Sequence, residues 1–394
     1  MSELQKLDQE YIANTYARFP LALVKGMGAE AFDEEGKRYI DLGTGIGVTS
    51  FGYCDEQWVT AVANQLTALQ HTSNLYYTEP CVKLAKLLCE KTGAGKVFFS
   101  NSGAEANECA IKAARKYMAE KKGEDCYTII TLENSFHGRT ITTLAATGQE
   151  VFHKTFKPLT DGFVHVPAND LEAVKQTVSE KKVAAMMIEC VQGEGGVLPL
   201  DPDYVKALSA YLKEQGILLI VDEVQTGNGR TGKLYGYMHY GITPDIISTA
   251  KGLGGGLPIG ATLLYGDVQN VFTYGDHGST YGGNPICCAG ALSVIERLDD
   301  RFLSEVQEKS AFVFESLQGA KGILSVKGLG LMIGIETKAP AKEVLLKCME
   351  KGVLCLTAKT KLRLLPPLNI TMEQLNEALE VIKTVCAETE EEHA

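Results

Sequence analysis

The run Ile217-Leu218-Leu219-Ile220-Val221-Asp222 decides the fold class of this 394-residue chain. Five consecutive aliphatic residues indicate a strand that is buried on both faces, as in a parallel sheet covered by helices. Before this run, Pro202–Gln215 has helical spacing, with Asp201 as N-cap and Pro202 at the first helical position. A helix that leads into a buried strand is the unit from which α/β folds are built.

Four further apolar runs have the length and composition of buried strands. Between two of them, Glu105–Lys121 has helical spacing. Strands that alternate with helices predict an α/β fold with a mostly parallel sheet. The four runs are Val97-Phe98-Phe99, Tyr127-Thr128-Ile129-Ile130, Ala184-Ala185-Met186-Met187-Ile188 and Asp245-Ile246-Ile247-Ser248.

The sequence pattern divides the chain into three parts. Residues 46–285 contain the alternating strands and helices and form the predicted large α/β domain. Residues 286–394 contain a long helical pattern and two strand-like runs, Leu329–Ile335 and Gly352–Leu356, which predict a smaller α+β domain. Residues 1–45 include Glu30–Ile40, which predicts a hairpin around an acidic turn with a glycine. We expect this first segment to pack against the smaller domain.

The composition excludes several classes of function. The chain has 38 basic and 49 acidic side chains and no block of Lys and Arg, so it lacks the charge that binds a phosphate backbone or an anionic membrane. The first ten residues are polar and acidic, and no stretch approaches about 20 uninterrupted apolar residues. The sequence therefore predicts a cytoplasmic protein with no nucleic-acid or membrane partner.

The eleven cysteines predict buried, reduced thiols. Their number is odd, several lie in apolar runs, and the sequence has no Cys-x-x-Cys pair. The histidines show no His-x-x-x-His spacing. We expect no metal site.

Ser102-Gly103-Ala104 follows a predicted strand and opens a helix. The backbone N–H groups of Gly103 and Ala104 and the hydroxyl of Ser102 would then form a cup for a phosphate. An ordinary capped turn would have the same sequence, and no Gly-Lys-Ser/Thr of a nucleotide-binding loop follows.

Asp222 places a carboxylate at the end of a buried strand, where an unpaired charge is costly. A protonated ring nitrogen of a cofactor would pair with it and would keep the ring able to accept electrons. The alternative partner is Arg230 in a salt bridge.

Lys251 follows another predicted strand and precedes the glycine-rich segment 252–256. Glycines allow the backbone to pass close to a bulky ligand. A lysine that is desolvated beside a cationic ring becomes a usable amine for an imine. The alternatives are a surface lysine, or a dinucleotide loop, for which the glycine spacing is wrong.

Phe136-His137-Gly138-Arg139 also follows a strand. An aromatic ring that stacks on a flat cofactor and an arginine that binds a carboxylate are what an amino-acid site of this kind requires.

In this order, the motifs resemble those of the class-III aminotransferases of fold type I. The resemblance covers nearly the whole chain and implies a seven-stranded central sheet with a smaller α+β domain, and pyridoxal 5′-phosphate (PLP) as cofactor. The motifs are Ser102-Gly103-Ala104, Phe136–Arg139, Gln192–Gly196, Asp222–Gly227, Lys251 and Gly278–Pro285, and similarity continues at Asn14–Pro20, Ser73–Pro80, Gly328–Glu336 and Arg363–Leu368.

The resemblance also implies a role for each cofactor residue. Lys251 would be the Schiff base and proton shuttle. Asp222 would pair with the pyridine nitrogen, and Gln225 would approach the ring hydroxyl. Thr280 would reach the phosphate of the neighbouring subunit, so the active unit would be a homodimer. The remaining cofactor contacts would come from Ser102, Gly103, Ala104 and Phe136.

For substrates, the resemblance implies transfer of the δ-amino group of N2-acetyl-L-ornithine to 2-oxoglutarate, giving the semialdehyde and glutamate. Arg139 would bind the distant carboxylate and Arg363 the α-carboxylate of glutamate, with Glu194 masking Arg363 in turn and Ser279 contacting the substrate. The segment Gly43–Gly47 offers only small or aliphatic residues, which leaves space for an acetyl group.

Other activities use the same residues. Ornithine, succinylornithine or an N-acyl-diaminopimelate precursor are alternative donors. An aminomutase would use Asp222 and Lys251 without a second substrate. A third alternative is a catalytically silent PLP-binding or structural protein, and the complete set of catalytic residues argues against it. The chain departs from the family pattern at Cys190, where proline is usual, and we expect this to change local stiffness and to place a thiol close to the cofactor.

Overall fold

Seven strands form the central sheet of the computed structural model, which describes residues 3–392. Their order is β4-β12-β11-β10-β7-β5-β6. The sheet is parallel except for β12, which is antiparallel to both β4 and β11. The predicted mostly parallel sheet is confirmed. The strands are β4 Lys96–Ser100, β5 Thr128–Leu132, β6 Phe163–Val166, β7 Val183–Ile188, β10 Leu218–Asp222, β11 Ile246–Thr249 and β12 Gly260–Leu264.

Helices begin where the sequence provides caps. Asp201 accepts the N–H groups of Asp203 and Tyr204, so α8 begins at Pro202 as predicted. α5 begins at Gly103, two residues before the predicted start, because Ser102 is its N-cap. The helices are α1 Glu3–Tyr11, α2 Thr44–Gly47, α3 Glu56–Ala68, α4 Glu79–Thr92, α5 Gly103–Lys122, α6 Ile141–Ala146, α7 Leu171–Glu180, α8 Pro202–Gln215, α9 Pro285–Ile295, α10 Asp300–Leu317, α11 Ala341–Glu350 and α12 Met372–Glu392.

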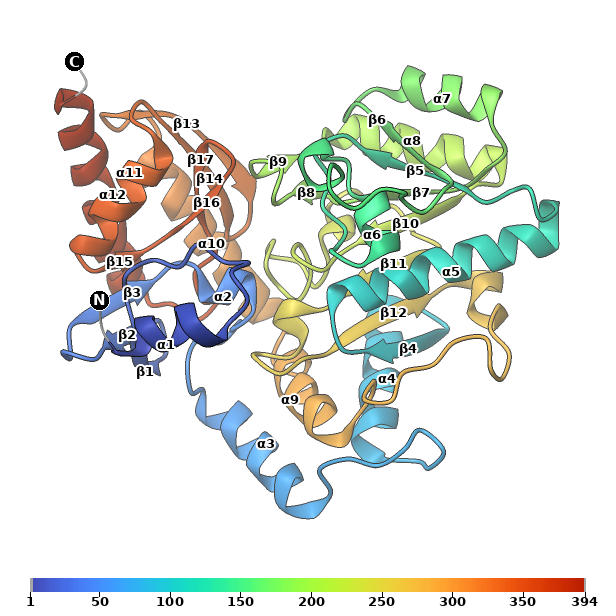
Figure 1. The fold of residues 1–394 in the computed structure, drawn as a ribbon, viewed down its shortest axis with the longest axis horizontal. Coiled ribbons are helices and arrows are strands. Elements are labelled where there is room, and N and C mark those ends of the chain that lie inside the picture. The colour runs from blue at the N-terminus through green and yellow to red at the C-terminus, as the bar shows by residue number, and fades with distance from the viewer. Residues whose placement is uncertain (1–2, 393–394) are drawn as a thin grey trace.

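Two four-stranded sheets form the other side of the molecule, on the left of Figure 1, and a two-stranded sheet lies between them and the large sheet. One has the order β1-β2-β3-β15, another β13-β14-β17-β16, and β8 pairs with β9. β3 pairs with β15, so strands from the N-terminal and C-terminal parts of the chain share a sheet, as the blue and orange-red ribbons show (Figure 1). The strands are β1 Leu23–Met27, β2 Glu30–Asp33, β3 Arg38–Asp41, β8 Val191–Gln192, β9 Leu198–Pro199, β13 Ile323–Leu329, β14 Met332–Thr337, β15 Val353–Leu354, β16 Leu356–Ala358 and β17 Lys361–Leu364.

Two predicted elements in this region have different outcomes. The hairpin over Glu30–Ile40 is confirmed by the antiparallel pair of β2 and β3. The prediction of one strand over Leu329–Ile335 is wrong, because a turn divides it between β13 and β14. Gly330 has a φ of +60°, and a Cβ there would lie 2.3 Å from the backbone of Thr231, so the turn requires glycine.

Every residue of β7, β10 and β11 is buried, which explains their continuous apolar sequences. α5 packs across this sheet and contacts β4, β7, β10, β11 and β12. Within residues 3–392 no helix combines the length and apolar character needed to cross a membrane.

Candidate active site

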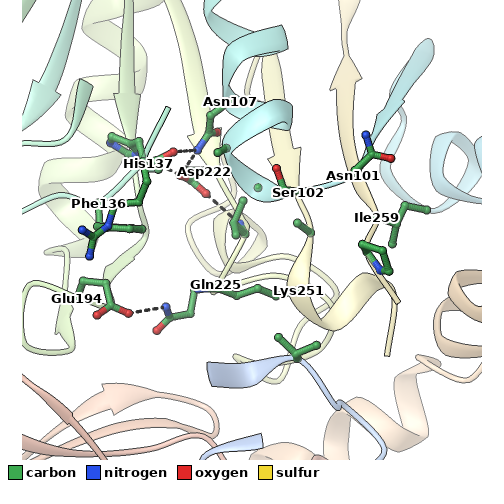
Figure 2. A pocket seen from close by; sticks show the side chains of 18 of the residues that line it. Asn101, Ser102, Asn107, Phe136, His137, Glu194, Asp222, Gln225, Lys251 and Ile259 are labelled. Carbon is green, nitrogen blue, oxygen red and sulfur yellow. Dashed lines mark hydrogen bonds and ion pairs between the residues drawn. The ribbon is translucent and has the colours of Figure 1, made fainter. Parts of the chain in front are cut away.

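A cavity of about 440 Å³ lies at the carboxyl ends of β4, β5, β7, β10 and β11, the edge at which open α/β sheets bind ligands. Figure 2 shows the side chains that surround it. Nine residues predicted from the sequence line this cavity: Ser102, Gly103, Ala104, Phe136, Arg139, Glu194, Asp222, Gln225 and Lys251.

Asp222 is 3% exposed and is held by three groups. Its Oδ2 accepts hydrogen bonds from Asn107 Nδ2 and His137 Nδ1, both at 2.8 Å, and its Oδ1 accepts the Val224 N–H at 3.0 Å (Figure 2). Arg230, the alternative partner, instead donates to the carbonyls of Leu331 and Pro366. The salt bridge between Asp222 and Arg230 does not form.

His137 is buried behind this carboxylate. Burial alone would lower the pKa of His137, but the hydrogen bond and negative charge of Asp222 outweigh it and raise the pKa above its ordinary value. The hydrogen bond from His137 offsets the cost of burying the Asp222 carboxylate. The side chain of Asp222, held in this way, lines the cavity.

Lys251 follows β11 and faces the same cavity. Burial lowers the pKa of its amine, and the positive charge of Arg363 adds to this effect. Its backbone φ of +45° is rare for a residue with a side chain and indicates strain at this position. The neutral amine is the form of lysine that acts as a nucleophile, and a lowered pKa favours this form.

The N-terminus of α5 forms the predicted anion cup. Gly103 and Ala104 open the helix, so their N–H groups have no acceptor within it. Ser102 caps the helix by accepting the Glu105 N–H at 3.2 Å. A Cβ on Gly103 would lie 2.6 Å from Val224, so the close packing here requires glycine.

Phe136 and Arg139 lie close together in the lining of the cavity. The Arg139 guanidinium lies 5.5 Å from the ring centre of Phe136 and 4.3 Å from that of Phe152. Arg139 is exposed. It is thus available to a carboxylate that enters from solvent.

Arg363 on β17 approaches the cavity from the other sheet. It is buried, and its Nη1 lies 2.5 Å from Glu194 Oε1 and 3.2 Å from Gln225 Oε1. Gln225 Nε2 also donates to Glu194, at 3.4 Å (Figure 2). Burial raises the pKa of Glu194, but the charge of Arg363 outweighs this and lowers it, so the pair is ionised.

Ser279 and Thr280 lie apart from this cavity, in a separate hollow beside His71, Ser73 and Asn74. Ser279 is connected to the site because its Oγ accepts a hydrogen bond from Asn101, at 3.0 Å, and Asn101 lines the cavity. Thr280 is exposed.

The segment Gly43–Gly47 ends beside the cavity, which Val48 lines. Four successive residues, Thr44 to Gly47, have φ between +48° and +73°, a left-handed turn that is costly for residues with side chains. Asp41 holds the turn by accepting the N–H groups of Gly43 and Thr44. The turn brings only Val48 to the cavity wall.

Sequence reasoning gave no role to three residues of this site, Asn107, His137 and Glu189. Asn107 interrupts the apolar face of α5 and Glu189 directly follows β7, and these positions are the signals that could have identified them. Cys190 does not line the cavity, contrary to the expected position of its thiol, which lies 3.9 Å from Glu223. The expected change in local stiffness stays a prediction.

A lysine, a buried carboxylate and a helix N-terminus that meet at the edge of a seven-stranded sheet define the class of fold-type I PLP enzymes. The sequence matches the family "Aminotransferase class-III" over residues 11–386. The chain belongs to the class-III aminotransferases, which makes it a PLP-dependent enzyme.

Individual relatives match this chain over nearly its full length. The chain is 51% identical to an acetylornithine aminotransferase from Haemophilus ducreyi, covering 98% of this chain and 99% of that protein. It is 47% identical to one from Caldanaerobacter subterraneus, covering 97% and 98%. Among solved structures, the ornithine aminotransferase from Toxoplasma gondii, with PLP partly occupying its site, has a TM-score of 0.94 at 32% identity, covering 99% and 95%.

The residues present fit this cofactor. The buried carboxylate of Asp222 suits a cationic ring nitrogen, the opening of α5 suits a phosphate, and the lowered pKa of Lys251 suits attachment of an aldehyde.

Proposed function

We propose that this chain transfers the δ-amino group of N2-acetyl-L-ornithine to 2-oxoglutarate, giving N-acetyl-L-glutamate 5-semialdehyde and L-glutamate, as a step of arginine biosynthesis. The observation that carries the proposal is the ion pair between Glu194 and Arg363 at the cavity that Lys251 faces. The names of relatives at 42–51% identity support it.

Bound PLP supplies an electron-accepting ring next to the carbon that gains or loses a proton. Asp222, stabilised by His137 and Asn107, would hold the positive charge on the ring nitrogen. Lys251 would attach the cofactor and then carry a proton to and from the reacting carbon through its Nζ. Burial lowers the pKa of this amine, which favours the neutral form that accepts a proton.

Three further contacts would fix the cofactor. The N–H groups of Gly103 and Ala104 with the Ser102 hydroxyl would hold the phosphate, and Phe136 would stack on the ring. Gln225, at the cavity wall, would reach the ring hydroxyl.

Two arginines would orient two different substrates. Acetylornithine reacts at its δ-amine, far from its carboxylate, whereas glutamate reacts at the amine beside its α-carboxylate. Arg139, exposed at the rim, would bind the distant carboxylate in each case. Arg363 would bind the α-carboxylate of glutamate and 2-oxoglutarate, and Glu194 would cover Arg363 while acetylornithine is bound. Ser279 would contact the substrate from the rim through its link to Asn101.

The acyl group of the donor requires space beside the cavity. The turn at Thr44–Gly47 brings only Val48 to the wall, and Val48 is small enough to leave that space. Ornithine is the second candidate donor, because the Toxoplasma gondii ornithine aminotransferase superposes with a TM-score of 0.94.

We also propose an oligomeric state, a cellular location and a division into domains for this enzyme. Thr280 is exposed in the single chain and would complete the phosphate site of a second copy, forming a cytoplasmic homodimer with shared active sites. The chain would divide into a segment over residues 1–45, a large domain over 46–285 and a small domain over 286–394, and the pairing of β3 with β15 supports the packing of the first with the last.

A donor panel tests the proposed function. Acetylornithine, succinylornithine, ornithine and an N-acyl-diaminopimelate precursor are each supplied with and without 2-oxoglutarate, and glutamate formation is measured. We expect the highest kcat/KM with acetylornithine and no turnover without 2-oxoglutarate. A higher kcat/KM with ornithine would replace the proposed donor, and turnover without 2-oxoglutarate would indicate an aminomutase.

A further inference from the structure

One carboxylate, that of Glu189, joins two loops of the active site. Its Oε1 accepts the N–H of Phe136 at 2.9 Å, and its Oε2 accepts the N–H of Gly193 at 3.3 Å. Phe136 belongs to residues 134–139, here called the stacking loop. Gly193 directly precedes Glu194 in residues 191–197, here called the gate loop. The two loops that carry the ring-stacking and arginine-masking side chains therefore share one acceptor group.

Glu189, the acceptor in this link, is held in place by the buried strand that precedes it. Glu189 follows β7, whose residues are all buried, and is itself 5% exposed. A carboxylate in such a place needs donors, and the backbone N–H groups of the two loops supply them. A movement of either loop therefore changes the hydrogen bonding of a buried charge.

We propose that Glu189 is a positioning residue: its ionised carboxylate holds the stacking loop and the gate loop together, and its protonation releases the gate loop. Only the kinetic consequence of this proposal rests on the proposed function of Glu194 and Arg363. The link between the loops follows from the two hydrogen bonds alone.

The chemistry of the carboxyl group explains the release. An ionised carboxylate accepts at both oxygens, whereas a protonated one turns one oxygen into a donor and cannot accept both N–H groups well. The longer bond, to Gly193, is the one that is lost first. Burial raises the pKa of Glu189 to about 7, although the charge of His137 opposes this. The groups that surround Glu189 are His137, Asp222, Lys251 and Cys190, with Glu194 and Arg139 lining the same cavity.

Glu223 offers a matched control. It follows Asp222, is also buried, has a pKa raised to about 7 by burial, and accepts two backbone N–H groups, those of Gly236 and Tyr237, at 2.8 and 2.7 Å. These groups belong to a segment outside the stacking and gate loops. Glu223→Gln therefore makes the same chemical change at a carboxylate that accepts neither the Phe136 N–H nor the Gly193 N–H.

Hydrogen–deuterium exchange of the holoenzyme without substrates tests the proposal. In Glu189→Gln the amide oxygen can keep the bond to Phe136, and its NH2 then opposes the Gly193 N–H. We expect exchange of peptides from the gate loop to become about tenfold faster at pH 8, with the stacking loop unchanged. Glu223→Gln should leave both loops as in the wild type. Wild-type exchange in both loops of Glu189→Gln would overturn the proposal.

A pH series on the wild type keeps the test independent of whether the variant folds. After correction for intrinsic exchange, the gate loop should lose protection as the pH falls from 8 to 6, because Glu189 gains its proton in this range. The loss should persist in Glu223→Gln. Constant protection of the gate loop from pH 8 to 6 would contradict the proposal.

Half-reaction rates separate this inference from the proposed gate. If the gate loop is released in Glu189→Gln and the glutamate half-reaction becomes faster relative to the acetylornithine one, both ideas are supported. If exchange changes but the ratio of the two rates does not, the positioning role of Glu189 is kept and the gating role of Glu194 is wrong.

Discussion

Arg363 and Glu194 form an ion pair of 2.5 Å in which the two side chains are very unequally exposed, 3% for Arg363 and 29% for Glu194. Arg363 sits on β17 and Glu194 on a loop. We therefore expect the arginine to be the fixed member of the pair and the glutamate to be the one that moves. A substrate carboxylate that replaces Glu194 would find Arg363 already in place.

The attachment of the cofactor is tested at Lys251. Borohydride treatment of the holoenzyme should fix PLP to the peptide that contains Lys251, and peptide mass spectrometry locates the label. Lys251→Ala should still bind PLP through Asp222 and the N-terminus of α5. Its turnover should fall by about 100-fold to 10,000-fold, because the proton carrier is gone. A label on another peptide would refute the assignment.

The pairing of Asp222 with His137 is tested by Asp222→Asn, which keeps the shape and removes the charge. We expect turnover to fall at least about 100-fold. The raised pKa of His137 means that its protonated form stabilises the fold fully below the pKa of an unfolded histidine, and that this contribution is lost as the pH rises through the folded value. In Asp222→Asn burial is opposed only by the charge of Glu189, the smallest of the raising effects, so the His137 pKa should fall, which NMR titration of the ring measures. An unchanged His137 pKa would show that Asp222 does not control it.

The fold was predicted better than the contacts within the site. Asp201 and Pro202 mark the start of α8 in the sequence itself, and the aliphatic run before Asp222 can only be a buried strand in this setting. β12 was not predicted because the run at Gly260–Leu264 is short and follows a glycine-rich loop. No helical pattern precedes it to indicate an alternating strand. Its antiparallel direction depends on its pairing with β4 and β11, which no local pattern encodes.

Local sequence patterns also could not predict which groups pair with the buried charges. His137 lies 85 residues from Asp222 in the sequence, and Asn107 lies 115 residues away. Arg230, only eight positions from Asp222, was the nearer alternative, but its guanidinium turns to two carbonyls instead. The alternating fold brings strand ends together from distant parts of the chain, so proximity in sequence is a poor guide to partners at this edge.

Assembly and cofactor binding are linked if Thr280 completes the phosphate site of a second subunit. Dilution without PLP should then give monomers more readily than dilution with PLP, because a ligand that binds only the dimer stabilises it. Thr280→Ala should weaken PLP binding about tenfold, and the exposed Thr155→Ala serves as control. Analytical ultracentrifugation with a PLP titration measures both. A monomer that binds PLP with full affinity would contradict the link.

The space for the acyl group is tested at Val48. Val48→Tyr places a large ring at the cavity wall, where it should obstruct an acylated donor more than a free diamino acid. We expect kcat/KM for acetylornithine to fall about tenfold or more relative to that for ornithine. An equal loss with both donors would mean that the acyl group lies elsewhere in the cavity.

The account depends most on Glu194 acting as the movable cover of Arg363, and single-turnover rates of the two half-reactions in Glu194→Ala test this directly. The charge-assisted bond that Glu194 makes is worth about 1.5–3 kcal/mol, and its loss removes the competitor of the glutamate α-carboxylate. The glutamate half-reaction should therefore become roughly tenfold faster relative to the acetylornithine one, with PLP binding intact and other α-amino acids now accepted as donors. Glu133→Ala, an exposed glutamate nearby in the fold, should leave the ratio unchanged. An equal loss in both half-reactions of Glu194→Ala would show that the pair with Arg363 is structural and that the pocket distinguishes its two substrates in another way.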